Sequence, residues 1–294
     1  MKEHLIPIME KFITLVSIRL SDDVTACLQQ LREAEDSSLQ KALYDSYFEN
    51  FKKAVELQKP CCQDTGMPQF YIKTGTAFPY IDIISDVITE AVRRATKSAP
   101  LRPNAVNFFD GRNTGDNTGE RAPWINWDIL PDSSQMEITL YLSGAGCSLP
   151  GQAKVFKPSD GIEAIIPFVS DAVFGPGKNA CPPLLVGIGL GHNIENAALL
   201  SKKALLRQIG SAHPHPEGER LEQRIREGLN SMGMGAQGLP GNQAVMGVHI
   251  ESSARHTATI ACAVNTACYV LRKGTVIFNK DLSCELPSHK VASL

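Results

Sequence analysis

Short apolar segments that run into glycine turns alternate in this chain with longer segments of helical periodicity. Residues 136–146 (MEITLYLSGAG) and 180–191 (ACPPLLVGIGLG) are typical of buried strands. Further strands are predicted over 68–73 and 274–278, and two consecutive strands over 245–270. Apolar residues at three- and four-residue spacing predict helices over 9–20, 22–35, 38–58, 82–98, 194–208 and 221–232. We therefore expect an α/β fold, a mixed β-sheet flanked by helices with an N-terminal helical segment.

The sequence contains no internal repeat and no low-complexity linker. We expect a single domain over 1–294, with a helical N-terminal part over 1–60 and a second part over 61–294 that begins after Pro60. The formal net charge is −2 and no basic stripe is present, so neither nucleic acid nor an anionic membrane is expected as a partner. No apolar stretch is long enough for a membrane span, and the N-terminus lacks the features of a signal peptide. We expect a cytoplasmic protein.

Eight cysteines lie at positions 27, 61, 62, 147, 181, 262, 268 and 284. A disulfide framework is typical of small secreted chains, and no C-x-x-C pair indicates a zinc ribbon. Cys62, Cys181 and Cys268 lie at transitions between strands and loops, whereas Cys27 and Cys262 lie in apolar-periodic segments typical of a core. Adjacent residues in an extended segment point in opposite directions, so at most one of Cys61 and Cys62 faces a given site. These observations alone favour buried thiols, and they leave a reactive thiol or a soft-metal ligand open.

Other motifs have simple structural explanations. Asp64 in D-T-G is typical of a residue that closes a turn. The stretch 101–134, rich in Gly, Asn and Pro, is either a surface loop or a segment whose backbone approaches a ligand. The segment GIGLGHN only loosely matches a dinucleotide-binding turn, since His192 occupies the last glycine position and the required acidic residue is not clearly placed.

Three motifs together carry a resemblance to a known family: CQDTG (62–66), NACPPLLVGIG (179–189) with the following AALLSKKALLR, and GVHIESSARHTATI (247–260) with VNTACY. They resemble the iron–sulfur (class I) fumarate hydratase family over essentially the whole chain. The segment GCSLPGQAKVF (146–156) is similar to the tartrate dehydratase alpha subunits of that family. The resemblance implies the N-terminal-domain fold of that family and a [4Fe–4S] cluster on Cys62, Cys181 and Cys268. Three cysteine ligands leave one iron open to act as a Lewis acid on a substrate hydroxyl.

The resemblance also implies roles for individual residues. Asp64 matches the family's acid/base aspartate and Gln63 lies beside the substrate. Arg102 matches an arginine that binds a substrate carboxylate, and His256 matches a histidine that contacts the substrate and takes part in catalysis. Gly144 belongs to a glycine turn whose backbone approaches the ligand. Cys147 follows that turn, and we do not expect it to be a cluster ligand.

The implied function is the alpha subunit of a hydro-lyase that dehydrates L(+)-tartrate to oxaloacetate and water. A separate beta subunit is expected to complete the site in an α2β2 assembly, so the isolated chain should bind an oxygen-labile cluster but turn over little. One alternative is the alpha subunit of a two-subunit fumarate hydratase acting on fumarate and malate. An alternative of another class is a non-catalytic iron–sulfur redox or oxygen sensor.

Overall fold

The computed structural model describes residues 1–294, which form two compact units. Unit 1 comprises Met1–Asp22, Phe48–Gly144 and Val270–Leu294, and unit 2 comprises Asp23–Tyr47 and Ala145–Tyr269. Each unit has its own mixed sheet and its own hydrophobic core. The predicted α/β fold, with helices flanking mixed sheets and an N-terminal helical segment, is confirmed.

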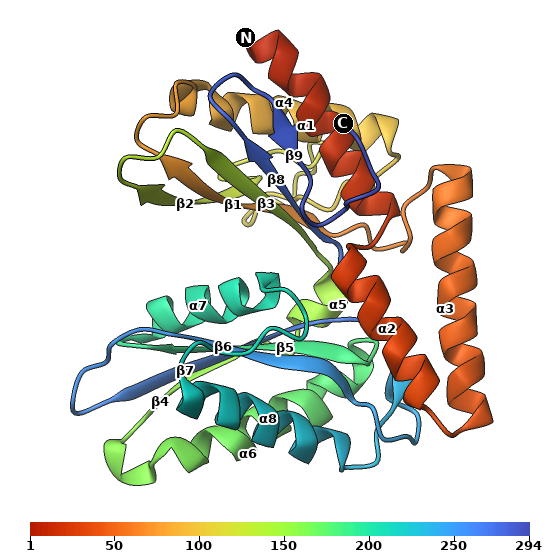
Figure 1. Cartoon of the computed structure of the whole chain (residues 1–294), viewed down its shortest axis with the longest axis vertical. Coiled ribbons are helices and arrows are strands. Elements are labelled where there is room, and N and C mark those ends of the chain that lie inside the picture. Colours follow the sequence, from red (N-terminus) through yellow and green to blue (C-terminus); the bar gives the residue numbers. More distant parts are fainter. The chain divides into compact units, whose positions relative to one another are not determined.

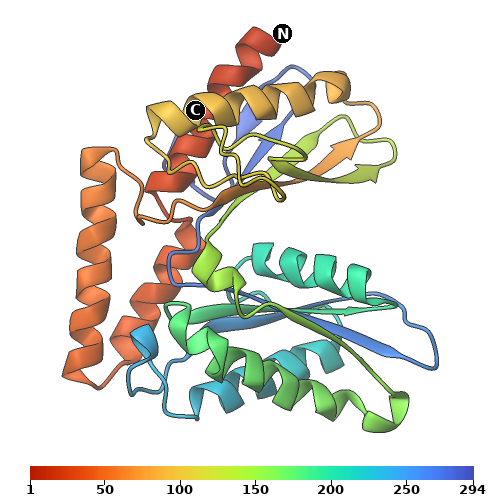
Figure 2. The same ribbon diagram turned by 180° about the vertical axis from the view of Figure 1, so that it is seen from behind.

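Unit 1 is built on a five-stranded sheet in the order β2-β1-β3-β8-β9. Its strands are β1 (Met67–Gly75), β2 (Trp124–Leu130), β3 (Met136–Ser143), β8 (Lys273–Phe278) and β9 (Cys284–Glu285). Strands β1 and β2 are parallel, and the other neighbouring pairs are antiparallel. Helices α1 (Lys2–Ile18) and α4 (Ile81–Ser98) lie side by side over one face of this sheet (Figures 1 and 2).

The core of unit 1 follows from the two-residue alternation of its strands. Phe70 and Ile72 of β1 lie opposite Leu140 and Ile138 of β3, and none of the four is more than 1% exposed. The apolar stripes of α1 and α4 cover these residues and complete the core. The unit thereby holds the ends of β1 and β3, where several predicted site residues lie, on a rigid sheet.

Unit 2 is built on a four-stranded sheet in the order β4-β7-β5-β6. The strands are β4 (Gln152–Phe156), β5 (Leu184–Gly191), β6 (Val245–Ser252) and β7 (Ile260–Ala267). Strands β5 and β6 are parallel, whereas β7 is antiparallel to both β4 and β5. Helix α7 (Ile194–Leu206) covers one face of the sheet, and α6 (Ile165–Phe174) and α8 (Pro216–Asn230) cover the other (Figure 1).

The glycines of the segment GIGLG serve the packing of α7 and not a dinucleotide. A Cβ atom at Gly187 would lie 2.3 Å from the Ser201 carbonyl oxygen, and one at Gly189 would lie 1.9 Å from that of Ala197. Only glycine lets the backbone of α7 approach β5 this closely. Asn193 caps α7, and its side chain accepts a hydrogen bond from the Asn196 N–H.

The two remaining long helices lie where the chain passes from unit 1 into unit 2 and back. Helix α2 (Asp22–Ala34) lies mainly in unit 2, and α3 (Ser38–Leu57) belongs to unit 2 up to Tyr47 and to unit 1 from Phe48. A short helix, α5 (Ala145–Ser148), opens the second segment of unit 2. Single 3₁₀ turns, η1 (Pro158–Asp160), η2 (Ile162–Ala164), η3 (Pro176–Asn179) and η4 (Ala236–Gly238), lie between the larger elements.

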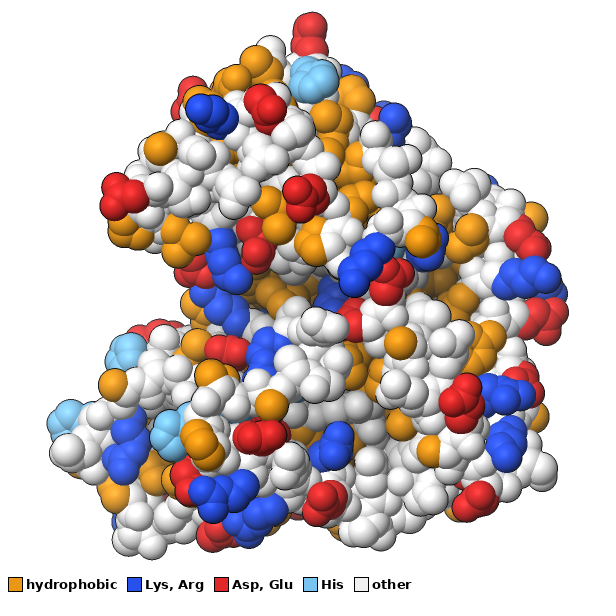
Figure 3. All heavy atoms as spheres, viewed as in Figure 1, with side chains coloured by type: hydrophobic (Ala, Val, Ile, Leu, Met, Phe, Trp, Pro, Cys, Tyr) orange, Lys and Arg blue, Asp and Glu red, His pale blue; other side chains and the backbone are white.

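None of the helices combines the length and the apolar character that a membrane crossing requires. On the face drawn in Figure 3, Lys and Arg side chains are interspersed with Asp and Glu side chains in both units. That face therefore shows no continuous basic stripe of the kind that nucleic acid would need.

Candidate functional site

The residues predicted to form the site divide between the two units. Unit 1 contains Cys62, Gln63, Asp64, Arg102 and Gly144, and unit 2 contains Cys181, His256 and Cys268. Each half is described by itself.

The loop that carries Cys62 is tied down by its neighbour Cys61. The Cys61 N–H and thiol both point to the Ser17 carbonyl oxygen, at 3.2 and 3.5 Å, and Asn50 donates to the Cys61 carbonyl oxygen at 2.8 Å. Cys61 is buried, whereas Cys62 is only half-buried. Burial raises the pKa of the Cys61 thiol to about 11, so Cys61 stays protonated. The two adjacent cysteines therefore differ as expected, and Cys62 is the one that a ligand can reach.

Asp64 closes the turn that follows Cys62. Its Oδ1 accepts from the Gly66 N–H at 3.1 Å and from the Asn104 side-chain amide at 3.3 Å. The Asp64 carbonyl oxygen accepts from Nη1 of Arg272 at 2.6 Å, and Arg272 is only 2% exposed. Gly66, with φ +79°, packs so closely on the end of β3 that a Cβ there would lie 2.7 Å from the Leu142 backbone. The structural role proposed for Asp64 is confirmed, and the same contacts fix the direction of its carboxylate.

The backbone at Arg102 is bound to the same turn. The Arg102 N–H donates to the Thr65 hydroxyl at 3.0 Å, while the guanidinium side of the residue is exposed. The buried side chain of Asn117 accepts from the Asn104 N–H at 2.7 Å and donates to the Arg102 carbonyl oxygen at 3.0 Å. Unit 1 thus brings Arg102 and the Cys62–Asp64 loop together.

In unit 2, Cys181 and Cys268 come together from segments far apart in the sequence. Cys181 is exposed with φ +57°, and Cys268 directly follows β7 and is half-buried. The Tyr269 N–H donates to the Cys181 carbonyl oxygen at 3.3 Å. The pKa of the Tyr47 hydroxyl is raised to about 12, mainly by burial; the hydrogen bond from Gln237 lowers it, and the charges of Cys181 and Cys268 contribute to the rise. Both sulfur atoms therefore lie within electrostatic reach of the same hydroxyl.

His256 lies in the exposed loop between β6 and β7, as expected. Its Nδ1 accepts from the Ala258 N–H at 3.1 Å, so the neutral ring carries its proton on Nε2. Cys268 follows the other end of β7, an eight-residue strand. At about 3.3 Å per residue, the strand separates His256 from Cys268 by more than roughly 20 Å. Unit 2 does not bring His256 and its cysteines together.

Three further cysteines are poor candidates for ligands because they are buried. Cys27, Cys147 and Cys262 are buried, in agreement with the predicted core positions of Cys27 and Cys262. Burial raises the pKa of the Cys262 thiol to about 12. None of the eight cysteines forms a disulfide, and no group of three or more His, Cys, Asp or Glu side chains lies close enough to hold a metal ion.

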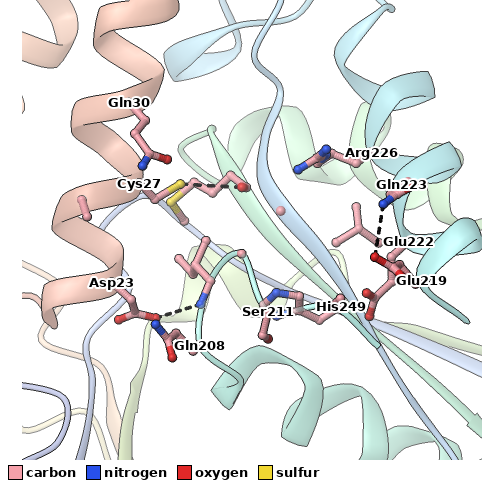
Figure 4. A pocket seen from close by; sticks show the side chains of 17 residues that line it. Asp23, Cys27, Gln30, Gln208, Ser211, Glu219, Glu222, Gln223, Arg226 and His249 are labelled. Atoms are coloured by element: carbon pink, nitrogen blue, oxygen red, sulfur yellow. Dashed lines mark hydrogen bonds between the residues drawn. The ribbon is translucent and has the colours of Figure 1, made fainter. Parts of the chain in front are cut away.

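Unit 2 also contains a cavity of about 410 Å³ beside α2, α8 and β6 (Figure 4). Asp23, Cys27 and His249 line it, together with Glu222, which forms an ion pair of 2.7 Å with Arg207. None of the predicted site residues lines this cavity. It therefore lends no support to the predicted chemistry.

The structure adds residues that the sequence motifs do not mark. In unit 1 they are Asn104, Asn117 and Arg272, and in unit 2 Tyr47 and Gln237. Asn117 lies in the Gly- and Asn-rich stretch, which already suggested a special backbone. Arg272 and Gln237 carry no local signal, because their partners lie far away in the sequence.

Comparisons with known proteins agree with the resemblance. The sequence model of the family described as fumarate hydratase (Fumerase) matches residues 6–277. The L(+)-tartrate dehydratase subunit alpha of Escherichia coli strain K12 is 48% identical over 287 residues, which are 98% of this chain and 95% of that protein. The protein of the same name from Shigella boydii has the same identity and coverage. A putative L(+)-tartrate dehydratase subunit alpha from Methanocaldococcus jannaschii is 38% identical over 262 residues, 87% of this chain and 91% of that protein.

The family match spans nearly all of both units, and the relatives are matched over nearly their whole length. The cysteine loops, the D-T-G turn and the strand β5 all fall within the matched region. The chain belongs to the fumarate hydratase (Fumerase) family.

Proposed function

We propose that this chain is the alpha subunit of a hydro-lyase that dehydrates L(+)-tartrate to oxaloacetate and water. The observation that carries the proposal is the 48% identity, over 98% of the chain, to a protein named L(+)-tartrate dehydratase subunit alpha. Both compact units, taken together as one alpha domain, take part in this function. Eight cysteines without a disulfide suit a reducing compartment, which supports a cytoplasmic location.

Three thiolates are the ligand set that a [4Fe–4S] cluster with one open iron requires, and we assign Cys62, Cys181 and Cys268 to that role. These three combine accessible thiols with loops at strand ends, and unit 2 places Cys181 next to Cys268. In unit 1, Nε of the buried Arg272 has no hydrogen-bond partner, as expected beside a site for a negatively charged group. When bound, the cluster would supply an open iron that acts as a Lewis acid on a substrate hydroxyl.

The chain's own residues then orient the substrate and move a proton. Dehydration removes a proton from one carbon of tartrate and hydroxide from the next, and the resulting enol becomes the ketone of oxaloacetate. We assign the proton transfer to the Asp64 carboxylate, whose direction is fixed by Gly66 and Asn104. Arg102 would bind one carboxylate through its planar guanidinium, with Gln63 and the backbone at Gly144 beside the substrate.

His256 requires a second copy of the chain if it is to contact the substrate. Its loop and Cys268 lie at opposite ends of β7, so the two cannot reach one small dicarboxylate in the same subunit. An α2β2 assembly contains a second alpha subunit that can supply His256 from outside. Co-assembly of an Asp64→Asn chain with a His256→Ala chain should then restore part of the turnover that each variant lacks alone. Absence of any restoration would remove His256 from the proposal.

The beta subunit is inferred from the name "subunit alpha" that the relatives bear. We expect the isolated chain to take up iron and sulfide anaerobically but to turn over tartrate only after its beta subunit is added. The test is purification of the chain with and without the beta subunit, followed by iron, sulfide and turnover measurements. Full turnover by the lone chain would contradict the two-subunit proposal.

The second candidate function is that of fumarate hydratase, because the matching family bears that description. Turnover of L-tartrate, D-tartrate, malate and fumarate by the reconstituted pair separates the two candidates. Preference for L-tartrate supports the first proposal, and preference for malate and fumarate supports the second. Uptake of a cluster without turnover of any of these substrates would favour the sensor.

A further inference from the structure

A closed set of contacts within unit 2 connects the segments that carry Cys181 and Cys268. Cys268 is followed by Tyr269, whose N–H donates to the Cys181 carbonyl oxygen at 3.3 Å. The Tyr269 ring stacks on the Tyr47 ring, with the centroids 3.8 Å apart and the planes inclined by 17°. Tyr47 belongs to α3 and is only 5% exposed, so the helix provides a fixed surface against which the Cys268 segment rests.

Gln237 closes this set of contacts from the Cys181 side. Its side-chain amide donates to the Tyr47 hydroxyl at 2.9 Å, and its backbone N–H donates to the Pro182 carbonyl oxygen at 2.9 Å. Gln237 has φ +57°, a conformation that is unfavourable for residues with a Cβ. The contacts thus run from Cys181 and Pro182 through Gln237 and Tyr47 to Tyr269 and back to Cys181.

We propose that Tyr47 is a positioning residue that, through Tyr269 and Gln237, holds the Cys181 and Cys268 thiols ready for the cluster before it binds. The proposal rests on the proposed function, which makes these thiols cluster ligands. Cys181 is exposed and has φ +57°, a strained conformation that contacts from other segments help to maintain. Holding both thiols in advance lowers the entropy lost when a metal group binds.

A purely structural role for Tyr47 makes a different prediction. In that case any substitution that destabilises the same helix equally should release the cluster equally fast. Tyr44 provides the matched control, because it lies one turn earlier in α3, is fully buried and donates its hydroxyl to Gln243. Its ring meets the Tyr47 ring edge-on, with the centroids 5.7 Å apart, whereas the Tyr269 ring stacks on the face of Tyr47. Tyr44 therefore shares the burial of Tyr47 but takes no part in the stack on Tyr269 or in the hydrogen bond from Gln237.

The test compares the variants Tyr47→Leu, Tyr47→Phe and Tyr44→Leu after anaerobic reconstitution with iron and sulfide. The measurement is the rate at which an iron chelator bleaches the visible absorption of the cluster. Loss of an outer contact of this kind should accelerate release by roughly 10-fold in Tyr47→Leu. Tyr47→Phe keeps the stack on Tyr269 but loses the hydrogen bond from Gln237, so its rate should lie between those of the wild type and Tyr47→Leu. Tyr44→Leu should release at the wild-type rate. Equal rates for Tyr47→Leu and the wild type, or for Tyr47→Leu and Tyr44→Leu, would overturn the proposal.

A second readout needs no cluster and separates this inference from the proposed function. A short bifunctional thiol reagent is added to the cluster-free chain, and the Cys181–Cys268 cross-link is quantified by mass spectrometry. We expect rapid cross-linking in the wild type and in Tyr44→Leu and slow cross-linking in Tyr47→Leu. A wild type that cross-links rapidly but never takes up iron would refute the proposed function and leave the positioning of the thiols intact. Unchanged cross-linking in Tyr47→Leu would refute the positioning itself.

Discussion

Asn117 offers a direct test of how unit 1 holds the Arg102 segment. Its fully buried side chain accepts from the N–H groups of Asn104 and Ala105, at 2.7 and 3.3 Å. It also donates to the Arg102 carbonyl oxygen at 3.0 Å and to the Thr96 hydroxyl at 3.1 Å. Replacement by alanine removes all of these bonds without adding any bulk.

The expected loss of stability follows from these four bonds. At about 0.5–1.5 kcal/mol net for each, and with water able to rehydrate some of the groups, Asn117→Ala should lose about 2–4 kcal/mol. Asn117 has φ +60°, a conformation that glycine adopts without strain. Asn117→Gly should therefore be more stable than Asn117→Ala by about 1 kcal/mol, although both variants lack the same hydrogen bonds.

Urea-induced unfolding of the wild type and both variants measures these differences. We also expect the substrate KM of the complete enzyme to rise in both variants, because the backbone that carries Arg102 loosens. A loss below about 0.5 kcal/mol, which is typical of a surface substitution, would refute the positioning role of Asn117. A glycine variant less stable than the alanine variant would refute the strain argument.

Three further tests address the site, the fold and the pH dependence. Asp64→Asn removes the carboxylate, so turnover should fall by roughly 10²–10⁴-fold. The variant keeps the acceptor for the Gly66 N–H, so the iron content should stay unchanged. A fully active variant would remove Asp64 from catalysis. Gly189→Ala should prevent normal packing of α7 and lower Tm, since its Cβ would lie 1.9 Å from a carbonyl oxygen. Gly228→Ala in α8 is the control: its Cβ meets nothing within 4 Å, and Tm should rise slightly. Equal Tm values for the two variants would contradict the packing argument. Burial alone would raise the pKa of Asp116, but hydrogen bonds lower this pKa from 3.8 to about 2. The Asp116 carboxylate therefore stabilises the fold above about pH 4, and this stabilisation is lost as the pH falls to 2. In Asp116→Asn, Tm should decrease less than in the wild type as the pH falls from about 4 to 2. An unchanged profile of Tm against pH would show that the Asp116 carboxylate does not cause the decrease.

Local periodicity predicted those elements whose buried faces repeat along the chain. The helices over 82–98 and 194–208 and the strands over 68–73 and 274–278 are present as α4, α7, β1 and β8. Periodicity did not predict β2, β4 or α6. Strand β2 is an edge strand with no residue fully buried, so it lacks the alternation that marks a strand with one buried face. In α6 the mean hydropathy is high over the whole helix, so no single apolar stripe marks it.

The sequence by itself determined the family and the α/β class, and it separated the cysteines at strand ends from those in core segments. Position at a strand end separated Cys62, Cys181 and Cys268 from Cys27 and Cys262, and the structure confirms that separation by burial. These properties depend on local pattern and on motifs of a few residues, which a single sequence displays directly.

Only the tertiary structure decided how the site residues are supported and which of them lie together. The Tyr47–Gln237 hydrogen bond joins residues 190 positions apart, and the Asp64–Arg272 bond joins residues 208 positions apart. The placement of His256 and Cys268 at opposite ends of β7 likewise depends on the strand between them being straight and paired. Such contacts form when distant segments pack on a common sheet, and no local pattern in the sequence records the partner that packing selects.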